Sequence, residues 1–175
     1  MVNMIQKAKD QVLALTEGAY RTAAEAGRLP AGVAVRCGVE IPKDPANGDY
    51  TTTFALAAAK AMKKNPREIA GILMENMHLE GSYFISVEIA GAGFLNFRLG
   101  GGWYAGVLAA IDGEGPAYGR SDALRGQKIM VEFVSANPTG PMHMGNARGG
   151  VLGDTLAAVL AASGADVWRE FYVND

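Results

Sequence analysis

Cysteine and histidine are scarce in this sequence, which has one cysteine, Cys37, and two histidines among its 175 residues. A single cysteine excludes a disulfide within the chain and a cysteine-rich zinc site. Two histidines without the usual ligand spacing argue against a metal held by protein side chains. We therefore expect no metal centre of the protein's own.

Long apolar runs and a strong net charge are also missing. The N-terminus becomes charged at Lys7 and Lys9, too early for a secretory signal, and no apolar stretch is long enough to span a bilayer. The formal net charge of −2 argues mildly against a module that only binds nucleic acid, although a larger enzyme can bind RNA through a local patch. We expect no membrane partner and a cytoplasmic protein.

The first two thirds of the chain predict a small α+β domain. Apolar residues recur at helical or alternating spacing between Gly, Pro and Asn turn signals. The expected elements are a helix at 3–26, a strand at 33–41, helices at 51–63 and 66–77, strands at 83–90 and 94–99, and a helix at 103–111. We expect the last two strands to pair as a hairpin.

A loop rich in Gly and Pro marks the best domain boundary. We place the N-terminal domain at 1–113, a linker at 114–126 and the start of a second domain at 127–175. This second part predicts a strand, a loop, a helix and another strand. Two strands with one helix cannot bury a parallel sheet, so we expect an α/β domain that is incomplete.

The segment from Val131 to Gly150 joins the strand of this second part to its helix. A helix N-terminus at the end of a strand presents free backbone N–H groups, which favour phosphate. His143 and Asn146 lie where the loop becomes helix. Gly145 has no side chain, so that a ligand can approach the backbone there.

Three polar residues near the end of the strand are candidate ligand contacts. Glu132 interrupts an apolar strand, so its carboxylate should face water or a cation, and a guanidinium would suit its bidentate geometry. The alternative is an ion pair with a protein arginine such as Arg148, which could also pair with Asp154 or with phosphate. Ser135 and Asn137 follow at the strand end where α/β sheets bind ligands, unless they serve only the turn.

The strand expected at 94–99 has a polar face. A period of two places Phe94, Asn96 and Arg98 together. An aromatic ring, an amide and a cation in a row suit an unpaired RNA base. The alternative is an ordinary strand with one partly buried phenylalanine.

Met142-His-Met-Gly-Asn146 resembles the His-x-Gly-His signature of class I aminoacyl-tRNA synthetases. The flanking runs Glu132–Pro141 and Arg148–Asp154 resemble arginyl-tRNA synthetases in particular, and 48–52 and 91–99 look like that family's N-terminal domain. The resemblance implies an α+β N-terminal domain followed by the first β-loop-α-β unit of a Rossmann-like, His-x-Gly-His nucleotidyltransferase domain. We expect that catalytic domain to be incomplete, because the rest of the family's nucleotide-binding fold and its lysine loop are missing, as is the family's helical anticodon-binding domain.

The resemblance also implies an activity. ATP with Mg²⁺ would activate L-arginine to arginyl-adenylate, and the arginyl group would pass to tRNA(Arg); we expect a monomer, inactive as these 175 residues alone. By resemblance, His143 and Asn146 would act in catalysis, and the same two residues with Gly145 would bind ATP. The arginine substrate would be bound by Glu132, Ser135 and Asn137. The tRNA would be contacted by Phe94, Asn96 and Arg98.

One residue departs from the family signature. Asn146 stands where the common pattern has a second histidine, so it retains a neutral N–H donor but cannot become cationic. The alternative is that Asn146 only caps the helix.

Two other functions stay open. A stand-alone RNA-binding module would need only residues 1–113. Another nucleotidyltransferase with the same signature would need neither that domain nor Glu132.

Overall fold

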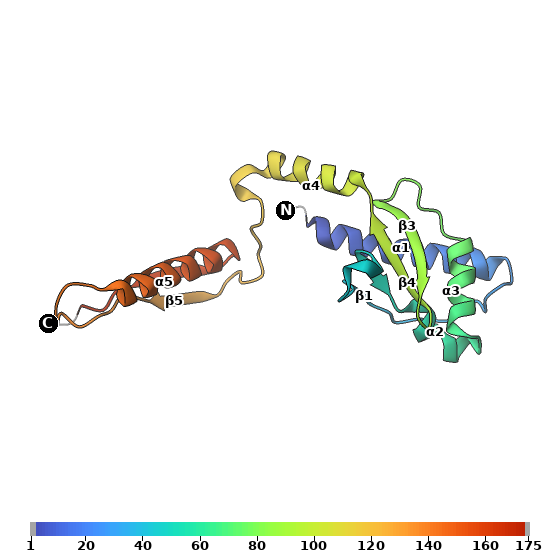
Figure 1. Cartoon of the computed structure of the whole chain (residues 1–175), viewed down its shortest axis with the longest axis horizontal. Coiled ribbons are helices and arrows are strands. Elements are labelled where there is room, and N and C mark those ends of the chain that lie inside the picture. Colours follow the sequence, from blue (N-terminus) through green and yellow to red (C-terminus); the bar gives the residue numbers. More distant parts are fainter. Residues whose placement is uncertain (1–2, 174–175) are drawn as a thin grey trace. The chain divides into compact units, whose positions relative to one another are not determined.

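The computed structural model describes residues 3–173. The chain forms two compact units, Val2–Asp112 and Gly113–Asp175. The elements that begin before the unit boundary are α1 (Met4–Glu25), β1 (Val39–Glu40), the 3-10 helix η1 (Pro45–Asn47), β2 (Tyr50–Thr52), α2 (Phe54–Met62), α3 (Pro66–Glu75), β3 (Phe84–Ala90), β4 (Phe94–Leu99) and α4 (Gly101–Glu114) (Figure 1).

The sheet of the N-terminal unit is antiparallel, with the strand order β1-β2-β4-β3. The predicted hairpin is confirmed, with Ala90 opposite Phe94 at its turn. Gly93 in that turn has φ 133°, and a Cβ there would come within 2.9 Å of the Pro66 backbone. A glycine is therefore required on both grounds, because L side chains avoid positive φ.

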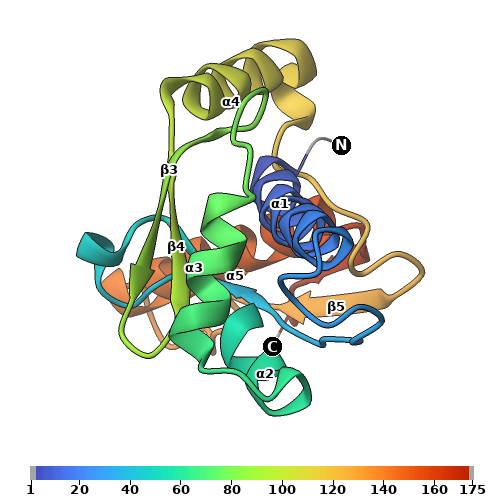
Figure 2. The same ribbon diagram turned by 90° about the vertical axis from the view of Figure 1, so that its right-hand side faces the viewer.

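Helices α1, α2 and α3 pack together and against the sheet, as Figure 2 shows for α3 beside β3 and β4. The core alternates along β4: Leu95 and Phe97 are fully buried, and the Phe97 ring lies 5.3 Å from that of Phe84. Aromatic pairs at such distances add to the stabilisation from buried area. The α3 start follows its sequence signal, because the Asn65 side chain accepts the Arg67 N–H over 2.9 Å and Pro66 comes next.

Two expectations need correction. The helix expected at 51–63 begins only at Phe54, because Tyr50–Thr52 is strand β2, which pairs with β1 and β4. Pairing on both sides outweighs the helix propensity of a short segment. The strand expected at 33–41 is reduced to Val39–Glu40. Side chains still alternate between half-buried and exposed from Val33 onward, but hydrogen bonding to a partner strand begins only at Val39.

The C-terminal unit contains a 3-10 helix η2 (Gly115–Ala117), β5 (Lys128–Glu132), α5 (Met144–Ala162) and β6 (Asp166–Glu170). β5 and β6 are parallel, with Lys128 opposite Asp166 and Glu132 opposite Glu170. Helix α5 connects them and packs on both strands. The predicted order of strand, loop, helix and strand is therefore confirmed, and the helix starts at Met144, directly after His143.

Few side chains are buried in this C-terminal unit. In the described part of α5 only Gly153 and Ala157 are buried. Many large apolar side chains are exposed: Met130, Met142, Met144, Val151, Leu152, Leu156, Val159, Trp168, Phe171, Tyr172 and Val173. One helix packed on a parallel pair of strands can cover only one face of the sheet.

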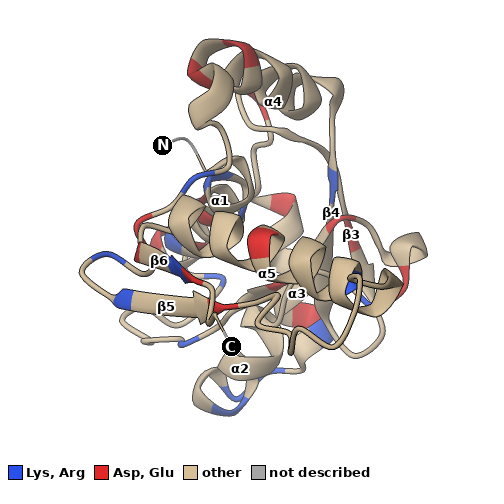
Figure 3. Ribbon diagram, turned by 90° about the vertical axis from the view of Figure 1, so that its left-hand side faces the viewer, with Lys and Arg blue, Asp and Glu red and all other residues tan. Residues whose placement is uncertain are grey.

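Charged residues of both signs are found throughout each unit. Figure 3 shows acidic and basic segments scattered over the elements of each unit. None of the helices within residues 3–173 is both long and apolar enough to cross a membrane.

Candidate functional site

The loop after β5 reaches α5 at His143, which is the N-cap of the helix. The His143 Nδ1 accepts the Gly145 N–H over 3.0 Å, and the Asn146 Oδ1 accepts the His143 N–H over 3.1 Å. The two side chains therefore satisfy backbone donors on either side of the cap reciprocally. Histidine is an unusual N-cap, and here the imidazole nitrogen does the work of a Ser or Asp oxygen.

This pairing decides which atoms of the site can reach a ligand. Because Nδ1 accepts a hydrogen bond, the neutral His143 ring carries its proton on Nε2. Because Oδ1 of Asn146 is occupied, its amide NH₂ remains to donate. The cap therefore presents two side-chain donors at the positive end of the α5 dipole, which suits an anion such as phosphate.

Gly145 has a structural role that the sequence does not show. A Cβ at this position would lie 2.8 Å from Cε1 and 2.9 Å from Nδ1 of His143. The absent side chain thus makes room for the histidine ring to fold over the Gly145 N–H. The expected close approach of a ligand to this backbone stays a prediction.

A cavity of about 500 Å³ lies beside the cap. It is lined by Val134, Met142, His143, Met144, Asn146, Ala147 and Gly150. Most of this lining is apolar, with the two polar side chains at the helix start. Such a surface suits a flat, partly apolar group that carries an anion at one end.

Glu132 ends β5 and is exposed, opposite Glu170 of β6. Within residues 3–173 its carboxylate has no ion pair, so the alternative of a pair with Arg148 is not observed. An exposed carboxylate beside another carboxylate is a suitable acceptor for a cationic ligand.

Ser135 and Asn137 lie on the loop directly after β5, and both are exposed. The Ser135 Oγ accepts the Tyr172 N–H over 3.0 Å, which ties the end of β5 to the segment after β6. Its hydroxyl proton is then directed to another acceptor. The Asn137 carbonyl accepts the Thr139 N–H over 2.8 Å, so part of its role is the turn.

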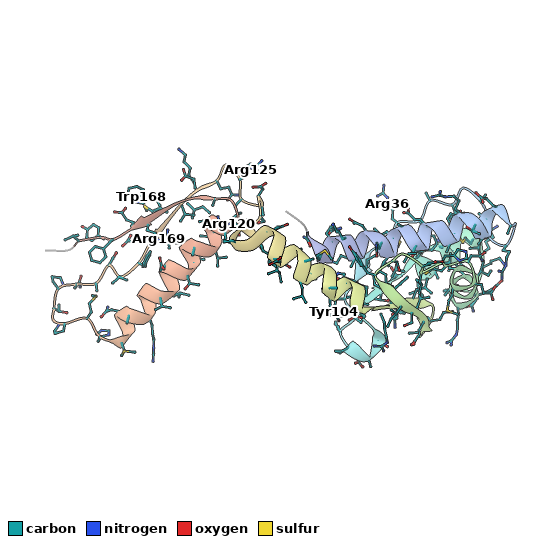
Figure 4. All side chains as sticks on the ribbon, turned by 90° about the horizontal axis from the view of Figure 1, so that it is seen from above. Arg36, Tyr104, Arg120, Arg125, Trp168 and Arg169 are labelled. Carbon is teal, nitrogen blue, oxygen red and sulfur yellow. The ribbon has the colours of Figure 1, made fainter. Side chains whose placement is uncertain are left out.

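The ion pair of Asp154 differs from the expected one. Asp154 on α5 pairs with Arg169 of β6, with 3.0 Å between Nε and Oδ1, and not with Arg148. Arg169 extends from the β6 strand in Figure 4. The reason is tertiary: α5 packs on β6, which brings a residue 15 positions away next to Asp154.

The polar face of β4 is more covered than its sequence suggests. Phe94 is 37% exposed, but Asn96 is only 8% exposed and lies between Thr51 of β2 and Glu88 of β3. Arg98 reaches over to donate to the Ala46 carbonyl of η1 over 2.7 Å. Next to Asn96, the Thr51 Oγ1 is buried without a hydrogen-bond partner among the described residues.

Burial raises the pKa values of two side chains in the N-terminal unit. Partial burial raises the pKa of the Cys37 thiol above 9.0; a hydrogen bond with Thr52 opposes this shift, and the Glu17 charge adds to it. Burial also raises the pKa of Tyr50 above 10.0, with a smaller effect from Asp49. In the described chain no group of three or more His, Cys, Asp or Glu could hold a metal ion.

Val134 and Arg169 are notable residues that the sequence did not single out. Val134 has φ 63°, a left-handed conformation that β-branched residues avoid, so no residue-type signal exists for it. Arg169 has a weak signal, since it lies on a predicted strand that follows the helix of Asp154.

Comparison with known families matches both units. Residues 16–99 match the family described as arginyl tRNA synthetase N terminal domain. Residues 114–175 match the family described as tRNA synthetases class I (R), catalytic domain.

Individual relatives carry the same description. The chain is 48% identical over 175 residues to an arginine–tRNA ligase of Acetivibrio thermocellus and 45% identical over 175 residues to one of Caldanaerobacter subterraneus. In both cases all of this chain is covered, and the chain spans 31% of the relative's length. A solved arginyl-tRNA synthetase of Plasmodium falciparum has a similar fold, with a TM-score of 0.54, 14% identity, and coverage of 93% of this chain and 30% of that chain.

Proposed function

This chain belongs to the arginyl-tRNA synthetase family, and from that premise we propose that it supplies the N-terminal domain and the first ATP-binding segment of an arginine–tRNA ligase. The enzyme activates L-arginine with ATP to arginyl-adenylate and transfers the arginyl group to tRNA(Arg). Since the chain spans 31% of its relatives, activity, substrates and partners of the whole enzyme are part of this proposal.

The observation that carries the proposal is the reciprocal cap of α5. Adenylate formation requires the arginine carboxylate to attack the α-phosphate of ATP, after which pyrophosphate leaves. Negative charge grows on phosphate oxygens in the transition state, and fixed donors placed there lower the barrier. The His143 Nε2–H and the Asn146 NH₂, at the positive end of the α5 dipole, form such a donor set. Gly145 keeps His143 in place.

Arginine would bind at the end of β5. We assign the guanidinium to the Glu132 carboxylate, whose exposure and lack of a protein cation within the described residues support the assignment. Ser135 and Asn137 would contact the substrate from the following loop. The bond from the Tyr172 N–H holds the Ser135 hydroxyl in place.

The tRNA would contact the N-terminal unit through β4. Phe94 offers a partly exposed ring on which an unpaired base of the D-loop can stack. The side chain of Asn96, though largely covered, makes no hydrogen bond to another residue of the described chain, which leaves its amide for a base edge. Arg98 already binds Ala46, so we assign it mainly to holding η1 beside the binding face.

The finer organisation belongs to the same proposal. We divide the chain into a domain at 1–113, a linker at 114–126 and the start of a Rossmann-like catalytic domain at 127–175. The compact units that meet after Asp112 and the parallel β5–β6 pair support this division. Mg²⁺ would come with ATP, and the enzyme would act as a cytoplasmic monomer.

Arginine-dependent ATP–pyrophosphate exchange, with and without tRNA(Arg), tests the proposal on the intact enzyme that contains this chain. We expect exchange with arginine only. His143→Ala should lower the exchange rate by about 10²–10³-fold, the usual loss for one transition-state donor. His78→Ala is the matched control, because the other histidine of the chain is exposed and makes no hydrogen bond or ion pair within residues 3–173.

Other outcomes separate the competing functions. Exchange with a different acid and no need of Glu132 would favour another nucleotidyltransferase. No exchange under any condition, with tRNA binding that is lost in Phe94→Ala, would favour an RNA-binding module.

A further inference from the structure

Val134 lies between Glu132 and Ser135 in a backbone conformation that valine rarely adopts. Its φ is 63°, and within residues 3–173 the only other non-glycine residue with positive φ is Lys63. Lys63 is explained by its place at the C-cap of α2, where left-handed residues are common. Val134 ends no helix, so its strain needs another reason.

The reason lies in the contacts with α5. In an extended strand consecutive side chains point to opposite faces. Here Phe133 and Val134 both contact α5: a Cβ on Gly153 would lie 2.4 Å from the Phe133 Cβ, and a Cβ on Gly150 would lie 3.1 Å from the Val134 Cγ2. The left-handed turn at Val134 allows two successive side chains to face the same helix.

The helix provides the matching surface. Gly150 and Gly153 are three residues apart in α5, so they share a face of the helix. Their lack of side chains lets the loop after β5 lie directly on the helix backbone. This explains two glycines inside a helix, where each is otherwise unfavourable relative to alanine.

The Val134–Gly150 contact also borders the candidate nucleotide cavity. Both residues line the cavity of about 500 Å³ that holds His143 and Asn146 on its polar side. The Val134 side chain therefore forms part of the cavity wall between the strand end and the helix.

We propose that Val134 is a positioning residue of the nucleotide site, and that its contact with Gly150 sets the depth of the cavity next to His143. This inference rests on the proposed function. It predicts that Val134 and Gly150 affect ATP binding jointly, although neither has a group that reacts.

A methyl group added at Gly150 tests the contact. In the intact enzyme, Gly150→Ala should raise the KM for ATP about tenfold in arginine-dependent pyrophosphate exchange while kcat stays within about twofold, the pattern of lost binding in both ground and transition states. Gly149→Ala is the matched control, since it makes the same change one residue earlier, where a Cβ meets nothing within 4 Å. We expect its KM for ATP to equal that of the wild type.

Removing the opposing methyl groups should restore binding. The double variant Gly150→Ala with Val134→Ala should return the KM for ATP to within about threefold of wild type, because the new methyl group occupies the space that the valine vacates. A KM for ATP equal in the Gly150→Ala and Gly149→Ala enzymes, or no rescue in the double variant, would overturn the inference.

A third variant tests the inference even if the Gly150→Ala enzyme misfolds. Val134→Gly accepts positive φ without strain and removes the wall side chain, so we expect a folded enzyme with a KM for ATP raised about threefold or more. An unchanged KM in this variant contradicts the inference even if Gly150→Ala cannot be purified. A wild-type enzyme without exchange activity would instead defeat the proposed function, and this inference with it.

Discussion

The two units of this protein hold their residues in place by different means. The N-terminal unit has a continuous core in which β4 supplies Leu95 and Phe97 and α1 to α3 cover the sheet. In the described part of the C-terminal unit, Ala157 is the one apolar side chain of α5 that is buried, and the candidate site is held by backbone hydrogen bonds and by glycines that admit close contact.

This difference has a consequence for function. A side chain packed in a core is fixed by many weak contacts, so its position tolerates the loss of any one of them. His143 and Asn146 are fixed by two hydrogen bonds, and Ser135 by one to Tyr172. Single-atom changes should therefore alter the C-terminal site while leaving the N-terminal unit intact.

The largest expected effect is a difference in unfolding between the two units when each is made as a separate polypeptide. Residues 3–112 as an isolated polypeptide should unfold cooperatively in urea with one transition in far-UV circular dichroism, because their core is self-contained. Residues 113–173 alone should show no cooperative transition, because so little of their apolar surface is buried. A sharp transition in the isolated C-terminal polypeptide would remove the contrast between the units.

Two phenylalanines on β4 sharpen the comparison within the N-terminal unit. Phe97→Ala removes a fully buried ring and should lower the free energy of unfolding by about 3–5 kcal/mol in urea titration. Phe94→Ala, three residues earlier and 37% exposed, should cost roughly 1 kcal/mol or less. Under the proposed function it should still weaken tRNA binding, measured by filter retention. Equal stability losses in the two variants would show that the Phe97 ring is no more important to the core than the partly exposed Phe94 ring.

Asn146 tests how the C-terminal site is held. Asn146→Ala removes the acceptor for the His143 N–H and should destabilise the start of α5 by about 1 kcal/mol, as a lost cap does. Asn146→Asp retains a carboxylate oxygen at the same place, favoured at a helix N-terminus, and should keep that stability. Native-state hydrogen exchange of the first turn of α5 in the intact enzyme measures both. Equal exchange rates in the two variants would show that the cap contributes nothing.

Asn146→Asp also separates the two roles of this residue. The variant loses the amide donor and places a negative charge toward the phosphate, so the KM for ATP should rise although the cap is kept. A variant with unchanged KM would restrict Asn146 to capping.

The smallest expected effect is the alkaline titration of Cys37 in the N-terminal unit. Its folded pKa is raised, so the thiol stabilises the fold fully below 9.0, and this contribution is lost as the pH rises through the folded pKa. Alkylation by iodoacetamide should have its pH midpoint above 9.0 in the folded chain and nearer the ordinary value in urea. Because this chain has one cysteine, all alkylation of its thiols is alkylation of Cys37. Identical midpoints in the two conditions would contradict the burial of the thiol.

Local chemistry allowed the sequence to predict much of this protein. Periodicity and caps define α1, α3 and the β3–β4 hairpin, because these depend on residues close together in the chain. The Gly-rich run after β5 likewise predicts a helix start at His143. Family resemblance added the assignment to arginyl-tRNA synthetases, which the comparisons support for both units.

Contacts between distant residues were decided only by the tertiary structure. Strand β2 exists because β1 and β4 lie on either side of Tyr50–Thr52. The burial of Asn96 depends on neighbouring strands, and the pairing of Asp154 with Arg169 depends on how α5 packs on β6. The left-handed backbone of Val134 opposes its own residue preference and occurs where its side chain packs against Gly150. In each case packing energy from non-local contacts exceeds the local preference that a sequence can express.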